Sequence, residues 1–400
     1  MTSGRKNWGS LLVAGGLITG LWFLFANLGG VLQSRFPNPL PSKEVIIAEI
    51  EEPVQEGPTP LRSQTSISIE PLPLITSADF SVPAALEAAV DFWRKIYAVY
   101  DSDQVVLHDA EDLSVIYGVI DLKDLNNLPE KEKMKSRESR VLEATRLLQE
   151  RLDEEHADRV RSQTGLKDKF IQAVRVSGRY LPLFEEIFVS YGVPQEITRL
   201  VFVESMFQER ARSKVGAGGL WQFLPGTARR FIKVDHWIDE RYDPIVSTHA
   251  AARLLLKNME EVGSWPLAIT SYNTGTGHVK KAVHTVGTTD IGTIIKRYRS
   301  DGFGFASRNF YPSFLAAYHV YENRERYFGS LEKEPVLEFD QVTLPVSVTF
   351  LQVAELSGSS LLEIQFLNPA YESRVFLEGM KLPVGAKIRV PKGRTLANLN

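Results

Sequence analysis

The stretch that decides the fold spans residues 192–230 and reads GVPQEITRLVFVESMFQERARSKVGAGGLWQFLPGTARR. Its first half predicts a helix, because Pro194 suits the first turn, where no backbone N–H donor is needed. One acidic residue, Glu204, falls on the apolar face of that helix. A carboxyl group held on a buried face is expected to have a raised pKa and can serve as a general acid. The apolar residues that set the helical period are Ile197, Leu200, Val201 and Phe207.

Two plainer interpretations of Glu204 stay open at this point. The carboxylate can pair with a distant arginine, or the helix can be rotated so that Glu204 lies at the edge of the buried face. The residues that follow favour a site, because Ser213 lies in a polar loop and the glycine-rich turn at residues 216–219 permits close approach of the backbone. Trp221 and Gln222 come next, and a wall of indole and amide suits a sugar ring, which offers an apolar face and a rim of hydroxyl groups.

Three ordered motifs carry a family resemblance. They are VESMF at residues 203–207, ARSKVGAGGLWQFLPGT at residues 211–227 and SYNTGTG at residues 271–277. The chain from about Leu166 to Ser330 resembles the catalytic domain of the lytic murein transglycosylases, especially the membrane-bound lytic murein transglycosylase D group. The resemblance implies a mainly α, lysozyme-like helical domain that acts on the glycan strands of peptidoglycan.

The resemblance also implies residue roles. Glu204 would be the single acid and base. Ser213 would orient Glu204 or the substrate, and Gln222 would contact the sugar. Tyr272 and Asn273 would hold the reacting unit and stabilise the transition state. If this motif stood alone, the preferred interpretation of Tyr272 and Asn273 would be a core tyrosine beside a capping asparagine, whereas together with the Glu204 stretch a site is favoured.

The implied reaction needs only one carboxyl group. Glu204 protonates the oxygen that links N-acetylmuramic acid to N-acetylglucosamine, and the C6 hydroxyl of the muramic acid then closes a 1,6-anhydro ring. Intramolecular attack gains the advantage of a fixed geometry. Two alternatives remain: a lysozyme-type hydrolase, which usually needs a second carboxylate, and a non-catalytic scaffold that binds peptidoglycan.

Composition limits the other function classes. The chain has 400 residues, of which 44% are hydrophobic and 24% charged, a balance ordinary for two or three globular domains. Its net charge of −3 argues against nucleic acid as a partner. The sequence has no cysteine, which excludes disulfides, thiolate catalysis and cysteine-bound metals. We expect no metal site and no cofactor.

The N-terminus predicts export. Residues 9–32 carry no charge and follow Arg5 and Lys6, so residues 1–36 are expected to form a transmembrane anchor with its N-terminus in the cytoplasm. A cleaved signal is the alternative. The catalytic domain would then be periplasmic, held at the inner membrane or released. Without cysteine there is no lipid-anchor site, unlike in the lipoprotein members of the family. Residues 37–78 are rich in Pro, Ser, Thr and Glu and predict a linker.

Residues 79–165 predict an accessory domain that packs around the catalytic domain or forms part of the glycan groove. A helix over 82–100, short strands at 104–107 and 114–122, and a long amphipathic helix over 134–160 are expected. His108 and Asp109 are interpreted as a turn rather than a metal site.

Further helices are expected in the catalytic region, residues 166–330. One covers 247–261, and another begins at Trp265 and ends at Tyr272 and Asn273. Most relatives have alanine at the position of Ser271. The acids of residues 237–244 are candidates for a second catalytic carboxylate, but a scaffold role is favoured, with Asp239 as a helix cap and Arg241 as its partner. Tyr311 can line the groove or belong to the core.

Residues 338–393 resemble a LysM domain, a β-α-α-β module that binds chains containing N-acetylglucosamine. Helices around 349–356 and 361–366 and a final strand at 387–391 are expected. The usual opening G-D-T is replaced by Val346, Ser347 and Val348, so a purely structural role is the alternative to glycan binding.

Overall fold

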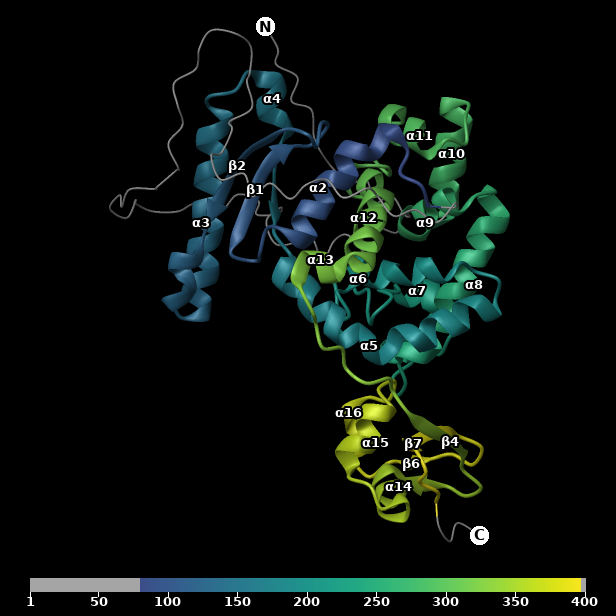
Figure 1. The fold of residues 1–400 in the computed structure, drawn as a ribbon. Helices are drawn as coiled ribbons and strands as arrows, with labels where there is room; N and C mark the ends of the chain where they lie inside the picture. Colours follow the sequence, from purple (N-terminus) through teal and green to yellow (C-terminus); the bar gives the residue numbers. More distant parts are fainter. Residues whose placement is uncertain (1–79, 397–400) are drawn as a thin grey trace, which may run out of the picture.

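The computed structural model describes residues 80–396, and the fold is mainly α, as expected (Figure 1). A helical body carries a three-stranded sheet on one flank and a small C-terminal module at one end. The anchor predicted at residues 9–32 and the linker predicted at residues 37–78 lie outside the described residues. Within residues 80–396, no helix is both long and apolar enough to cross a membrane.

The first described region is mixed in structure. Strand β1 (Gln104–Asp109) pairs antiparallel with both β2 (Ile116–Asp121) and β3 (Val160–Thr164), in the order β2-β1-β3. The prediction found β1 and β2 but missed β3. The predicted long helix over 134–160 was wrong, since α3 (Glu130–Gln149) and α4 (Glu154–Arg159) are separate; the remaining helical elements are η1 (Ala84–Leu86), α2 (Glu87–Ala98) and η2 (Lys123–Asn127).

A helix cap and the burial of two residues in a strand explain the errors in this region. Asp153 accepts a hydrogen bond from the His156 N–H and so starts a new helix, α4. His108 and Asp109 are buried at the end of β1, so their interpretation as a turn was wrong. Burial lowers the pKa of His108 to about 4, and the Asp109 carboxylate accepts a hydrogen bond from the Tyr117 hydroxyl.

The helical body has one hydrophobic core, to which α2 also contributes. In that core the Trp93 indole of α2 donates a 3.0 Å hydrogen bond to the Asn309 side chain of α12. Tyr311, also on α12, is 1% exposed, which places it in the core rather than in a groove. The elements of the body are α5 (Lys167–Ser190), η3 (Gln195–Arg199), α6 (Leu200–Glu204), α7 (Pro225–Ala228), η4 (Glu240–Tyr242), α8 (Pro244–Val262), α9 (Trp265–Thr274), α10 (Thr276–Val286), α11 (Ile291–Arg297), α12 (Phe305–Glu322) and α13 (Arg324–Phe328).

The helix predicted from Pro194 to Phe207 is shorter and less regular than expected. It begins as the 3₁₀ turn η3 and continues as α6, which ends at Glu204. Met206 and Phe207 follow with φ of 50° and 55°, so Phe207 is not part of the helical face. The prediction that Glu204 points inward is nevertheless confirmed, because its side chain is fully buried.

The predicted helices α8 and α9 are present. Asp243 caps α8 by accepting hydrogen bonds from two backbone N–H groups, and Pro244 occupies the first helical position. Gly275, with a φ of 85°, follows Thr274 and ends α9, so that Tyr272 and Asn273 lie in the last turn of the helix, as the motif predicted.

The C-terminal module has its own hydrophobic core. Its first strand, β4, pairs antiparallel with its last, β7, around two helices that each start with a complete capping box. This agrees with the expected β-α-α-β order, whereas a third short helix and a pair of two-residue strands were not predicted. Whether the module is a LysM domain stays a prediction. Its elements are β4 (Phe339–Thr343), β5 (Val348–Thr349), α14 (Phe350–Ser357), α15 (Leu361–Leu367), α16 (Ser373–Leu377), β6 (Lys381–Leu382) and β7 (Lys387–Pro391).

Candidate active site

Glu204 is the most unusual ionisable group at the centre of the helical body. Its side chain is 0% exposed, and neither carboxyl oxygen has a hydrogen-bond partner in the described part of the chain. Burial raises the pKa of Glu204 well above its ordinary value. The interpretation that pairs Glu204 with a distant arginine is therefore wrong within residues 80–396, and burial favours the protonated form of the group.

Tyr272 lies beside Glu204 and comes from the last turn of α9. Burial raises the pKa of the Tyr272 phenol, and the nearby charge of Glu204 raises it further. The phenol donates a 2.9 Å hydrogen bond to the backbone oxygen of Trp221. This contact ties α9 to the glycine-rich stretch and holds the tyrosine ring in one place.

The loop after α6 is built by backbone contacts. The Ser213 N–H donates to the Ala217 oxygen and the Ser213 Oγ accepts from the Ala217 N–H, both at 2.9 Å. Ser213 therefore closes the loop rather than contacting Glu204. Gln222 has a φ of 47° and donates a 2.8 Å hydrogen bond from Nε2 to the Gly219 oxygen. Its Oε1 has no partner among the described residues and is left to accept from a ligand.

Trp221 does not form the sugar-binding wall that the sequence suggested. The indole is fully buried, stacks on Phe188 with ring centres 5.3 Å apart and donates a hydrogen bond to Thr248. The aromatic residue of this stretch that lines the pocket is Phe223, two positions after Trp221. The tryptophan instead anchors the loop to α8 through Thr248.

Asn273 and Ser271 are further polar groups on α9. Asn273 is fully buried, and neither its amide nitrogen nor its oxygen has a partner within residues 80–396. The Ser271 hydroxyl is also buried and lacks a partner there. Since buried polar groups in folded proteins are nearly always hydrogen-bonded, these atoms mark a place where a polar ligand or water is expected.

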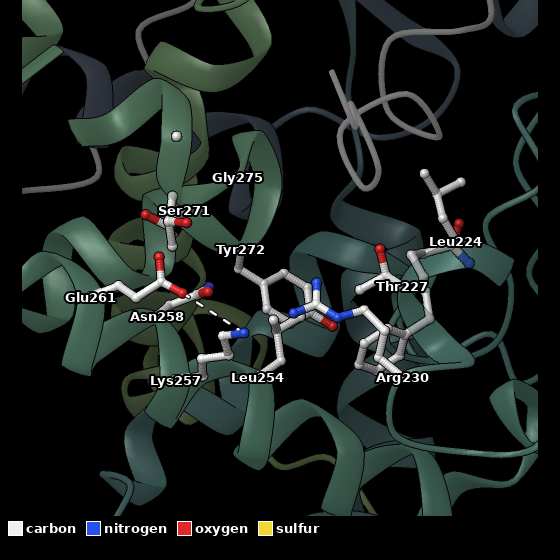
Figure 2. Close-up of a pocket in the computed structure, with 14 residues that line it drawn as sticks. Leu224, Thr227, Arg230, Leu254, Lys257, Asn258, Glu261, Ser271, Tyr272 and Gly275 are labelled. Atoms are coloured by element: carbon white, nitrogen blue, oxygen red, sulfur yellow. Dashed lines mark ion pairs between the residues drawn. The ribbon is translucent and has the colours of Figure 1, made fainter. Parts of the chain in front are cut away.

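A pocket of about 260 Å³ opens between α7, α8 and α9 (Figure 2). Two predicted site residues, Gln222 and Tyr272, line it, whereas Glu204, Ser213 and Asn273 do not. In Figure 2 the Tyr272 ring lies between the α8 side chains and those of the loop and α7. Glu204 is therefore buried and does not line this pocket, although it lies near enough to Tyr272, a lining residue, for its charge to raise the pKa of the phenol.

The sequence reasoning missed the charged groups of the pocket. Glu261 of α8 lines it and pairs with Lys280 at 2.8 Å and Lys257 at 3.9 Å. The hydrogen bond from Lys280 lowers the pKa of Glu261. Arg230 lies on the opposite side. The signal was available, because helical spacing puts Lys257 and Glu261 on one face of α8, four residues apart.

Two of the three acids of residues 237–244, Asp239 and Asp243, form buried ion pairs with arginines, in line with the favoured scaffold role. Asp239 caps η4 and forms a buried ion pair with Arg241 at 2.6 Å. Asp243 caps α8 and pairs with Arg389 at 2.6 Å. Because Asp239 and Asp243 are both ion-paired with arginines, neither of these two carboxylates is available as a catalytic base.

Comparison with known proteins agrees with this geometry. Residues 184–295 match the family described as Transglycosylase SLT domain. The chain therefore contains a transglycosylase SLT domain. All five predicted site residues, Glu204, Ser213, Gln222, Tyr272 and Asn273, lie within the matched range.

The matches to individual proteins cover only part of this chain and only part of each similar protein. Membrane-bound lytic murein transglycosylase D of Escherichia coli K12 is 29% identical over 187 residues, which are 44% of this chain and 39% of that protein. The transglycosylase of Enterobacteria phage PRD1 is 30% identical over 92 residues, 23% of this chain and 33% of that one. The chain thus spans about two fifths of the first relative's length. Among solved structures, the 70 kDa soluble lytic transglycosylase of Escherichia coli is 22% identical, with a TM-score of 0.31. That match covers 37% of this chain and 24% of the transglycosylase chain.

Proposed function

We propose that this chain is a peptidoglycan lytic transglycosylase that cleaves the β-1,4 bond between N-acetylmuramic acid and N-acetylglucosamine. The observation that carries the proposal is Glu204, a fully buried carboxyl group with a raised pKa inside a transglycosylase SLT domain. A carboxyl group with a raised pKa keeps its proton to a higher pH than an ordinary glutamate and can protonate a leaving glycosidic oxygen.

The proposed reaction uses Glu204 twice. In the first step its carboxyl proton passes to the glycosidic oxygen as the bond from that oxygen to C1 breaks, with assistance from the substrate's own acetamido group. In the second step the Glu204 carboxylate takes the proton of the C6 hydroxyl while the O6 atom bonds to C1. The enzyme regains its starting protonation state, no water is consumed, and the muramic acid ends as a 1,6-anhydro sugar.

The surrounding residues support this use of Glu204. The Tyr272 phenol, held against the Trp221 oxygen, presents its polar end beside the carboxyl group. The unpartnered Asn273 amide and Gln222 oxygen offer two N–H donors and two acceptor oxygens for hydroxyl and acetamido groups. Ser213 contributes by holding the loop that carries Gln222.

A lysozyme-type hydrolase is the second candidate, because Glu261 places a carboxylate in the pocket that the sequence reasoning had not included. In that mechanism a second carboxylate activates water or acts as nucleophile. The ion pairs with Lys257 and Lys280 keep Glu261 charged and weakly basic. This favours the lytic reaction over hydrolysis.

The test is to digest purified peptidoglycan with the protein and to measure the masses of the products by mass spectrometry. The lytic reaction gives muropeptides one water lighter than the hydrolytic products. Glu204→Gln should lower the rate by several orders of magnitude, since the amide cannot donate an acidic proton. Glu196→Gln, on the turn before α6, is the matched control and should cleave at the parental rate. Equal cleavage by the parent and Glu204→Gln would refute the site, and no cleavage by any variant would favour a wall-binding scaffold.

We also propose that the protein works in the cell envelope, on the periplasmic side, held by an anchor at residues 9–32. The support is the uncharged stretch in the sequence and the likeness to a relative named as membrane-bound. Fractionation tests this, since an anchored protein stays with membranes after a high-salt wash and a released one does not.

A further inference from the structure

The C-terminal module is joined to the SLT domain by backbone hydrogen bonds. The Asp239 N–H donates to the Ala370 oxygen at 2.7 Å, and the Glu372 N–H donates to the Trp237 oxygen at 3.1 Å. Between them Ile238 and Tyr371 form an antiparallel β-bridge. A segment of the module thus pairs like a strand with residues 237–239, although each side keeps a separate hydrophobic core.

A buried ion pair reinforces this contact. Arg389 of β7 donates to both carboxylate oxygens of Asp243, at 2.6 and 3.1 Å, and the two side chains are about 10% and 7% exposed. Bidentate pairs of this kind fix geometry as well as charge. The same carboxylate caps α8, the helix that forms one wall of the pocket.

The linker between the two parts is also held along its path. The Glu334 N–H donates to the Arg175 oxygen at 2.9 Å and the Leu337 N–H to the Arg179 oxygen at 3.0 Å, both on α5. The Arg179 guanidinium in turn lies over the Phe366 ring of the module at 5.0 Å. A module attached at three places is docked rather than loosely tethered (Figure 1).

The segment that receives the module also holds the site loop. Between the Asp239 and Asp243 contacts, Arg241 donates from Nη1 to the Gly216 oxygen at 2.7 Å and the Phe223 oxygen at 3.0 Å. Its own backbone oxygen fills the space beside Gly219, where a Cβ would lie 1.8 Å away. The conformation of residues 216–223, which include Gln222, is therefore held by contacts with residues 239–243.

We infer that the C-terminal module is a docked part of the catalytic unit and that Arg389 is a positioning residue, which acts through Asp243 and the 237–243 segment on the site loop. This inference deepens the proposed function and rests on it for its effect on turnover. It differs from the role expected of a tethered wall-binding module, which would raise the local concentration of glycan without altering the site.

The test compares three full-length variants. Arg389→Met removes the pair, Arg389→Lys keeps one charge contact, and Lys392→Met removes an exposed 2.8 Å pair with Asp340 inside the same module as the matched control. The substrates are intact peptidoglycan and a soluble tetrasaccharide of two N-acetylglucosamine–N-acetylmuramic acid units. We expect Arg389→Met to lower kcat about tenfold on both substrates with little change in KM. Arg389→Lys should recover part of the loss, and Lys392→Met should match the parent.

A second readout does not depend on activity. Hydrogen exchange of the amides at residues 211–223 should be about tenfold faster in Arg389→Met than in the parent and unchanged in Lys392→Met. Asp243→Asn keeps an oxygen for the helix cap but loses the charge pair, so it should show the same loosening if Arg389→Met does not fold.

The outcomes separate this inference from the proposed function. A parent without turnover, together with faster exchange in Arg389→Met, would sink the proposed function and leave the positioning role standing. Loss of cleavage on intact peptidoglycan alone, seen as a raised KM, would show that the module only binds the wall and would overturn the inference. Parental exchange at residues 211–223 in both Arg389→Met and Asp243→Asn would overturn it as well.

Discussion

Glu204→Gln should raise the free energy of unfolding while it abolishes cleavage, and this increase over the parent should grow with pH. The buried carboxyl group has its pKa raised by desolvation alone, so the folded state holds a proton that the unfolded state loses at about pH 4.3. Stability contributed by a group with a raised pKa is complete below the unfolded pKa and is lost as pH rises toward the folded one. Glutamine does not titrate and escapes this loss.

The size of the effect follows from linkage. In the range between the two pKa values, each pH unit costs the parent about 1.4 kcal/mol of unfolding free energy relative to the variant. Urea unfolding at a series of pH values above the unfolded pKa, followed by tryptophan fluorescence, should therefore show the difference in unfolding free energy between variant and parent widening with pH until the pH passes the raised pKa of Glu204.

The control substitution has the opposite sign. Glu261 has its pKa lowered by Lys280, so Glu261→Gln should lose a little stability above the unfolded pKa rather than gain it. A difference in unfolding free energy between Glu204→Gln and the parent that stays constant as pH rises through and above the unfolded pKa would refute the reasoning, because it would mean that Glu204 ionises in the folded protein as it does in the unfolded chain.

Other expected outcomes concern the pocket and the loop. Glu261→Gln should keep the peptidoglycan products anhydro and the rate within a few fold of the parent, and a loss of about a hundredfold or more would instead support the hydrolase. Tyr272→Phe should lower kcat about a hundredfold and leave the Trp221 oxygen unpaired, at a cost of about 1–3 kcal/mol in urea unfolding. Gly219→Ala should destabilise by about 3 kcal/mol because φ is 76° and a Cβ would meet a backbone oxygen, whereas Gly226→Ala, which meets open space, should change stability by about 1 kcal/mol or less. The cleavage rate should fall as pH rises above the raised pKa of Glu204, as a pH–rate profile would show.

The sequence was sufficient for the features that depend on local periodicity. The helical period placed Glu204 inward, and the same signal predicted α8 and α9 with ends within three residues of those observed. The sequence prediction failed where contacts between residues far apart in the chain determine the secondary structure. Strand β3 forms only because β1 pairs with it across a helical hairpin, and nothing in its own five residues distinguishes it from the end of a helix.

The same limit explains the errors within the site. Trp221 has the composition of a sugar-binding wall, but its neighbours Phe188 and Thr248, each about 30 residues away in the chain, take it into the core. Ser213 lies in the predicted loop yet points its hydroxyl to Ala217. A motif identifies which residues gather at a site, while the side-chain partners that fix each role come from elements that only the folded chain brings together.

The short helix before the site connects the fold to the proposed chemistry. Two consecutive residues with left-handed backbones, Met206 and Phe207, follow Glu204, a conformation that costs about 1–3 kcal/mol at each non-glycine position and persists only where packing enforces it. Phe207 supplies that packing, with its ring 4.8 Å from Phe202. The helix therefore ends at Glu204, whose side chain is fully buried. The same irregular backbone that the sequence did not predict thus leaves Glu204 in an environment where burial raises its pKa and favours the protonated form, which the proposed reaction requires at its first step.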